Sequence, residues 1–80
     1  MPKMRAKMLV QSVEQFENGE KLKMHPVCKS GGYPADGTDE DNTFAKFSPS
    51  GSLELFVNNP ALAGQFKPGQ KFYLDFTLAE

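Results

Sequence analysis

The stretch ENGEKLKM, residues 17–24, decides how the first part of this chain folds. It contains Asn18-Gly19, a residue pair that accepts the positive backbone angles of a tight hairpin turn. Apolar and polar residues alternate on both sides of this pair, which is the period of a half-buried strand. The stretch therefore predicts a hairpin of two antiparallel strands.

Each arm of the predicted hairpin has one apolar face. The apolar face of the first arm, MRAKMLV, carries Met4, Ala6, Met8 and Val10. The apolar face of the second arm, KLKMHPVCKS, carries Leu22, Met24 and Cys28. Because Pro26 has no N–H to donate to a neighbouring strand, we expect it on a sheet edge or at a bulge.

A second hairpin is predicted in the C-terminal half. NTFAKF, residues 42–47, and SLELFVNNP, residues 52–60, flank a turn-forming sequence at residues 48–51. The second of these segments carries Leu53, Leu55 and Val57 on one face. These two segments are therefore expected to pair with each other.

The remaining elements are short. PALAGQF begins with Pro60 and has Gly64 near its end, which predicts one helical turn near residues 60–65. KPGQ, residues 67–70, has proline and glycine at its central positions, which is typical of a type II turn. KFYLDFT then alternates as a last strand, with Phe72, Leu74 and Phe76 on one face.

Five short strands and one helical turn within 80 residues predict a single small all-β domain spanning residues 1–80. Because an open sheet of this size exposes many edges, we expect a five-stranded barrel or a curled antiparallel sheet, similar in size to OB or SH3 domains. Residues 1–3 are expected to form a ragged N-terminus. The predicted core consists of Met4, Ala6, Met8, Val10, Leu22, Met24, Leu53, Leu55, Val57, Phe72, Leu74 and Phe76.

Charge and cysteine content restrict the class of protein. Nine basic and ten acidic residues nearly cancel, which argues against a protein that mainly neutralises the phosphates of long duplexes. A single cysteine, Cys28, allows no intrachain disulfide and fits a reducing compartment. The apolar run near the start is too short for a signal sequence or a membrane span, so we expect a soluble cytoplasmic protein.

Most of the chain shows a resemblance to one group of proteins. The segments MRAKMLVQSVEQ, EDNTFAKFSPSGSLELFVNNPAL and FKPGQKFYLDFT resemble short, uncharacterised open reading frames of tailed bacteriophages, over about residues 4–77. The resemblance implies a phage protein made in the bacterial cytoplasm. It implies no activity, and no functional residue is carried over from it.

Side chains that often carry catalysis or bind metals do not fit known arrangements. His25 and Cys28 are three apart on a strand and point to opposite faces, which argues against a zinc site or a Cys–His nucleophile. The acidic residues do not match an EF-hand, and Gly31-Gly32 is not followed by a P-loop lysine. Glu54 and Asp75 can be cross-strand neighbours, but such pairs are usually solvated charges. We expect no enzyme, no metal and no cofactor.

The long acidic, Gly/Pro-containing loop at residues 31–42 is the first candidate for partner binding. Loops of this length in a small domain are often binding elements, and an aromatic residue there is a plausible interface anchor. For the loop by itself, the favoured interpretation is a solvated, mobile segment whose carboxylates meet only water, with its tyrosine folded back over the mouth of the barrel. The candidate partner-binding residues are Tyr33, Asp36, Asp39, Glu40 and Asp41, together with the outward-facing Phe56 and Tyr73.

The outer surface is the second candidate. Cations mixed with aromatic rings on a five-stranded barrel are typical of single-stranded nucleic acid binding, although lysines on solvent-facing strands also prevent edge pairing. The residues with this outward parity are Arg5, Lys7, Lys21, Lys23, Lys46, Phe56 and Tyr73.

The sequence thus favours a non-enzymatic interaction module that contacts a protein partner. The partner would be a host factor, including a defence protein, or another phage protein. A single-strand-binding barrel and a minor virion component remain the alternatives.

Overall fold

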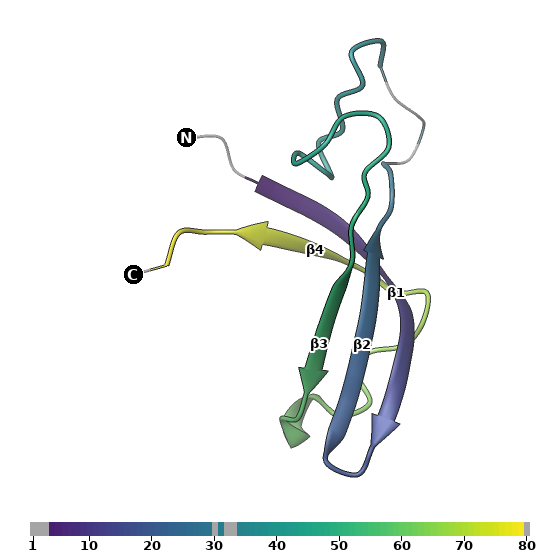
Figure 1. Ribbon diagram of the computed structural model, residues 1–80, viewed down its shortest axis with the longest axis vertical. Helices are drawn as coiled ribbons and strands as arrows, with labels where there is room; N and C mark the ends of the chain where they lie inside the picture. The colour runs from purple at the N-terminus through teal and green to yellow at the C-terminus, as the bar shows by residue number, and fades with distance from the viewer. Residues whose placement is uncertain (1–3, 30, 32–33, 80) are drawn as a thin grey trace.

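The computed structural model describes residues 4–29, 31 and 34–79 (Figure 1). The described chain forms one antiparallel sheet with the strand order β3-β2-β1-β4. Its elements are β1 (Met4–Phe16), β2 (Gly19–Pro26), β3 (Leu53–Val57), the 3-10 turn η1 (Pro60–Leu62) and β4 (Lys71–Phe76). The prediction of an all-β curled antiparallel sheet is confirmed, but the described residues contain four strands rather than five.

The fifth predicted strand, residues 42–47, does not form. Backbone bonds from Asn42 N–H to the Asp39 carbonyl and from Ala45 N–H to the Asn42 carbonyl turn this segment back on itself. β3 pairs instead with β2, so the predicted second hairpin is wrong. The polar side chains at the start of the segment bond to β1, and this explains why the segment does not extend as a strand.

The first hairpin is confirmed, but its turn differs from the prediction. Phe16 pairs with Gly19, which leaves Glu17 and Asn18 as a two-residue loop. Neither Asn18 nor Gly19 has a positive φ. Glycine is instead required by a close approach, because a Cβ at position 19 would lie 2.6 Å from the carbonyl oxygen of Val57.

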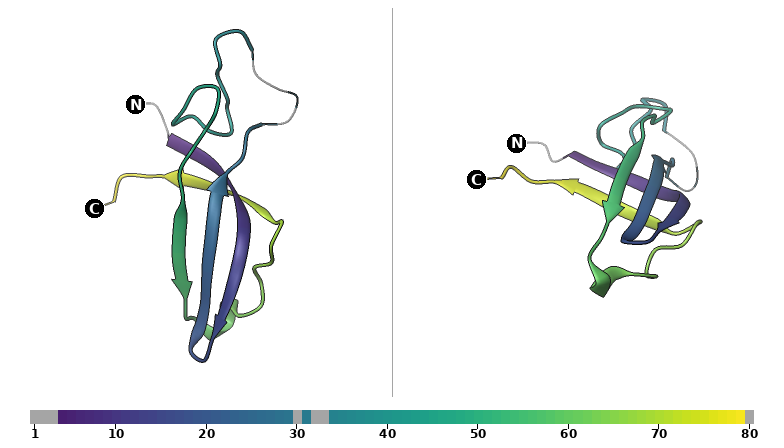
Figure 2. Two further views of the ribbon diagram at one scale, coloured as in Figure 1. Left: turned by 45° about the vertical axis from the view of Figure 1, so that its right-hand side comes forward. Right: turned by 60° about the horizontal axis from the view of Figure 1, so that its bottom comes forward.

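A bulge in β1 bends the sheet. The register between β1 and β2 shifts between Val10 and Ser12, and such a shift bends a strand and increases its twist. β1 pairs with β4 over residues 4–9 and with β2 over residues 8–16. The bulge therefore lies where two half-sheets meet: one consists of β4 and the first part of β1, and the other consists of the second part of β1 with β2 and β3. Figure 2 shows these halves turned toward one another. Pro26 is the last residue of β2, beyond the last pair of the β2–β3 ladder.

The core lies inside the angle between the two half-sheets. Leu53 and Leu74, on the two outermost strands, both pack against the same buried cluster, which places this cluster on the concave side. The buried apolar residues are Ala6, Met8, Val10, Leu22 and Met24, all of them predicted. Four other predicted core residues share this face but are 38% to 52% exposed: Met4, Leu55, Phe72 and Phe76.

Two local predictions in the C-terminal part are confirmed. The 3-10 turn η1 begins at Pro60 and is capped by Asn59, whose side chain accepts a hydrogen bond from Ala61 N–H. The turn before β4 has φ of 93° at Gly69 and is closed by Gln70 N–H donating to the Lys67 carbonyl. A positive φ at the third position is what a type II turn requires.

Candidate interaction surfaces

The acidic loop is fastened to the sheet by Asn42. Its side chain is fully buried, accepts a hydrogen bond from Lys7 N–H at 2.9 Å and donates one to the Val27 carbonyl at 2.7 Å. Thr43 adds a second attachment, because Arg5 N–H donates to its Oγ1 and its own N–H donates back to the Arg5 carbonyl. The loop therefore completes the side of β1 that β2 does not reach.

Asp39 is a buried carboxylate within the same attachment. It is 4% exposed and accepts hydrogen bonds from the side chain of Asn42 and from the backbone N–H groups of Lys29 and Asp41. Burial raises the pKa of this carboxyl, but these hydrogen bonds outweigh burial and lower the pKa below its usual value. The expectation that the loop carboxylates meet only water is therefore wrong for Asp39.

The other candidate residues of the loop differ in their surroundings. Asp36 is exposed and accepts hydrogen bonds from the backbone and hydroxyl of Thr38, which lower its pKa. Glu40 is exposed and lies 3.0 Å from Lys29 Nζ. Its pKa is lowered by its own backbone N–H and by Lys29. Tyr33 lies outside the described residues.

Candidate residues from the loop and the strands meet on the outer face of β1 and β4. Arg5 forms two hydrogen bonds with Asp75, at 2.6 and 3.2 Å, and its guanidinium stacks 4.5 Å from the ring centroid of Tyr73. The Tyr73 hydroxyl donates to Asp41, which also lies 3.3 Å from Lys7 Nζ. The hydrogen bonds with Asp75 lead a set of contacts that raise the pKa of Arg5.

The remaining predicted cations lie elsewhere. Lys21 and Lys23 are on β2, opposite Phe56 and Glu54 of β3. Lys23 Nζ is 3.8 Å from a Glu54 oxygen. Lys46 is not on a strand, so its predicted place on the outer sheet face is wrong. The seven residues of the nucleic-acid candidate set are thus divided between the two half-sheets and the loop.

The sheet order tests whether Glu54 and Asp75 are cross-strand neighbours. Glu54 is opposite Lys23 on β2, and Asp75 is opposite Arg5 on β1, so these two carboxylates are not cross-strand neighbours. Phe56 is half exposed and its ring centroid lies 5.5 Å from that of Phe16, a residue that the sequence analysis did not select.

The concave side carries an apolar groove that the sequence analysis did not predict. It has a volume of about 190 Å³ and lies between the β1–β4 half-sheet and the segment that leads into β3. The lining residues are Met4, Ala6, Met8, Pro26, Phe44, Ser50, Gly51, Ser52, Leu53, Leu74 and Phe76. Strand alternation identified one wall of this groove, but no local signal placed Phe44 and residues 50–52 opposite it.

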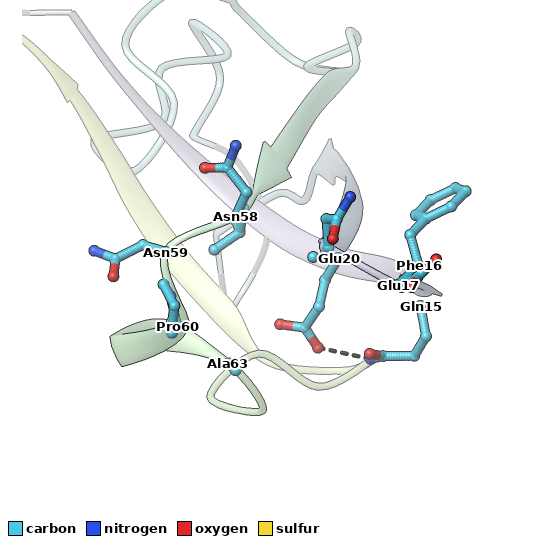
Figure 3. Close-up of a pocket in the computed structure, with 11 residues that line it drawn as sticks. Gln15, Phe16, Glu17, Glu20, Asn58, Asn59, Pro60 and Ala63 are labelled. Carbon is cyan, nitrogen blue, oxygen red and sulfur yellow. Dashed lines mark hydrogen bonds between the residues drawn. The ribbon is translucent and has the colours of Figure 1, made fainter.

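A second hollow, of about 420 Å³, lies beside the β1–β2 turn (Figure 3). Glu20 is 4% exposed there, and its two carboxylate oxygens accept hydrogen bonds from Gln15 Nε2 and from Gly64 N–H. The burial of Glu20 was not predicted from the sequence. Its parity with Leu22 and Met24 on β2 was the available signal.

Two general features of the described residues complete the description. No group of three or more His, Cys, Asp or Glu side chains among them is arranged to hold a metal ion. No helix in the described part of the chain has the length and apolar character that crossing a membrane requires.

In comparisons with known proteins, no family model, no curated protein and no solved structure matches this chain.

Proposed function

We propose that this chain is a non-enzymatic interaction module that binds a protein partner through the concave face of its sheet. The observation that carries the proposal is the exposure of large apolar side chains on that face. We use the name concave face for the surface that these side chains form. Each of them is 37% to 52% exposed: Met4, Phe44, Leu55, Phe72 and Phe76. Exposed apolar side chains that gather beside a groove are characteristic of interaction sites.

The shape of the domain supports this proposal. Domains normally bury the apolar face of a sheet against a second layer. Here the four strands form one curved sheet, and the domain has extents of 47 × 32 × 17 Å. A protein partner at the concave face would supply the missing layer.

The accessible surface of the whole chain is larger than that of a compact monomer of the same mass. The chain exposes 5910 Å². A compact monomer of 8.9 kDa exposes about 4,800 Å² by the size relation for folded proteins. The excess of about 1,100 Å² is comparable with the roughly 800 Å² that each partner buries in an interface of standard size.

The resemblance to phage reading frames guides the choice of partner. We propose a protein of the bacterial cytoplasm, either a host factor, including a defence protein, or another phage protein. A place in the virion is a variant in which the partner is a structural protein of the particle. The contact is assigned to the concave face rather than to the acidic loop, because Asp39 and Asp41 already bond within the chain.

Single-stranded nucleic acid binding is the second candidate function. Phe56 and Tyr73 support it, because they are 50% and 53% exposed and offer rings for base stacking. The paired charges weigh against it, since Arg5 and Lys7 each face a carboxylate within the chain. Titration of a labelled oligonucleotide at low salt tests this candidate, and undetectable binding would exclude it.

Affinity capture with a tagged chain from infected cells tests the proposed function. The variant Phe72→Ser with Phe76→Ser removes two half-exposed rings from the concave face. The control is Phe56→Ser, which removes a half-exposed ring from the outer face. We expect one specific protein to be captured by the unmodified chain and the control and lost with the double variant, provided that circular dichroism shows all three to be folded. Equal capture by all three would refute the assignment of the face.

A further inference from the structure

The two sides of the sheet differ in charge. Strand alternation places charged residues of all four strands on the outer face, among them Arg5, Lys23, Glu54 and Lys71. Among the strand residues on the concave side, the only charged one is Glu20. It is 4% exposed and already accepts two hydrogen bonds within the chain. The strands therefore present apolar side chains and no exposed charge on their concave side.

An uncharged apolar face can pack against a copy of itself. A two-fold symmetric interface brings the same patch of both copies together, so a charge in the patch is buried against an identical surface. Burial of a charge without a partner is costly. The concave face avoids this cost, whereas the outer face with its mixed charges does not.

We propose that a second copy of this chain covers the concave face while the protein partner is absent. The two curled sheets face each other with their concave sides inward, as two half-barrels close into one two-layer structure. Sheets packed in this way lie about 10 Å apart and their inner side chains interdigitate. The inference rests on the proposed function for the choice of face, and it adds that the partner displaces the second copy.

The surface area is sufficient for a stable dimer. The chain exposes 5910 Å², about 1,100 Å² more than a compact monomer of 8.9 kDa exposes by the size relation for folded proteins. An interface of standard size buries about 800 Å² on each partner. One such interface would bring each copy close to the accessible surface of a compact protein.

The small core also favours a second copy. The described part of the chain buries only five apolar residues. Domains of this size often depend on oligomerisation, because one core of their own contributes little net stability. A second layer would cover Leu55, Phe72 and Phe76, which are 38% to 52% exposed in one copy. The dimer thereby supplies the core that the single sheet lacks.

Sedimentation velocity of the purified full chain tests for the dimer. Over a range from about one micromolar to about one millimolar, we expect a concentration-dependent species of about twice 8.9 kDa. A monomer throughout this range would overturn the inference.

A matched pair of variants tests the face. Phe76→Ser removes a ring that is 52% exposed on the concave face, and Phe56→Ser removes a ring that is 50% exposed on the outer face. Because each dimer of the first variant loses two interface rings, we expect its Kd to rise about tenfold or more. The control should keep the Kd of the unmodified chain, with circular dichroism showing that both variants are folded. Equal Kd values for the two variants would overturn the assignment.

A measurement on the unmodified chain does not depend on the folding of any variant. In a mixed sample of isotope-labelled and unlabelled copies, isotope-filtered NMR detects only contacts between copies. We expect such contacts from the methyl groups of Leu55 and the rings of Phe72 and Phe76. Contacts confined to outer-face residues such as Tyr73 would overturn the proposed arrangement.

The failure of this inference and the failure of the proposed function give different results. Sedimentation and NMR use the purified chain without any partner, so a monomer in these experiments rejects the dimer and leaves capture of a partner untouched. Conversely, equal capture by the concave-face and outer-face variants rejects the proposed function, while a dimer that is weakened only by Phe76→Ser still supports the inference.

Discussion

Replacement of Asn42 by alanine should remove most of the stability of this domain. The Asn42 side chain is the connection through which the acidic loop completes β1. Without it, the N–H of Lys7 and the carbonyl of Val27 lose their partners, and Asp39 loses one of its donors. Asn42 is fully buried, so bulk water does not reach its side chain in the folded chain.

The magnitude follows from the groups that are left without partners. Each buried backbone donor or acceptor that loses its hydrogen bond costs about 1–3 kcal/mol. Two such groups predict a loss of about 2–6 kcal/mol in the free energy of unfolding. Because a domain of this size has a net stability of only about 3–5 kcal/mol, the variant should be largely or partly unfolded at 25 °C.

Urea unfolding followed by circular dichroism measures this effect, and Asn58→Ala is the matched control. Asn58 is exposed, so its replacement should change stability by less than about 0.5 kcal/mol. Asn42→Asp sharpens the test, since it keeps the acceptor for Lys7 N–H but places a second carboxylate against Asp39. We expect that variant to be less stable at pH 7 and to recover in part as the pH falls. A loss below about 1 kcal/mol for Asn42→Ala would refute the attachment described above.

Three other outcomes are expected. The pKa of Asp39 is lower in the folded chain than the value of about 3.9 for an unfolded aspartate, so its contribution to stability is present above about pH 4 and disappears as the pH falls through the folded pKa; acid titration of stability should show a smaller loss for Asp39→Asn. Gly19→Ala should cost about 1–3 kcal/mol in thermal or urea unfolding, because its Cβ would contact the Val57 carbonyl; an unchanged midpoint would contradict this close approach. Thr43→Val removes the acceptor of Arg5 N–H and should cost about 1 kcal/mol, less than Asn42→Ala; the reverse order would be inconsistent with the burial of the two side chains.

The sequence predicted the parts of the fold that depend on nearest neighbours in the chain. Alternation along residues 4–10 and 20–24 identified the hairpin and the face that becomes the core, and the Pro68-Gly69 turn followed from its own two residues. The bulge in β1 could not be read in this way. It depends on the different strands that pair with the two halves of β1, and therefore on long-range pairing.

The candidate sites show the same limit more clearly. The pattern of residues 36–41 indicated exposed charge, and this holds for Asp36 and Glu40. Asp39 has a similar local sequence context but is buried, because Asn42 and two backbone N–H groups surround it once the loop meets β1. Likewise, Phe72 and Phe76 were assigned to the core by parity. Their exposure depends on whether a second layer covers the concave face, which alternation does not report.

The side-chain attachment of the loop gives β1 two kinds of backbone amide. The N–H groups of Arg5 and Lys7 are held by Thr43 and Asn42, whereas those of Ala6 and Met8 are held by β4. In hydrogen exchange, release of the loop exposes only the first pair, and separation of β4 exposes only the second. The exchange rates of adjacent amides in one strand therefore report two different opening events. A ligand that suppresses only one of these events slows the exchange of only the corresponding alternate amides.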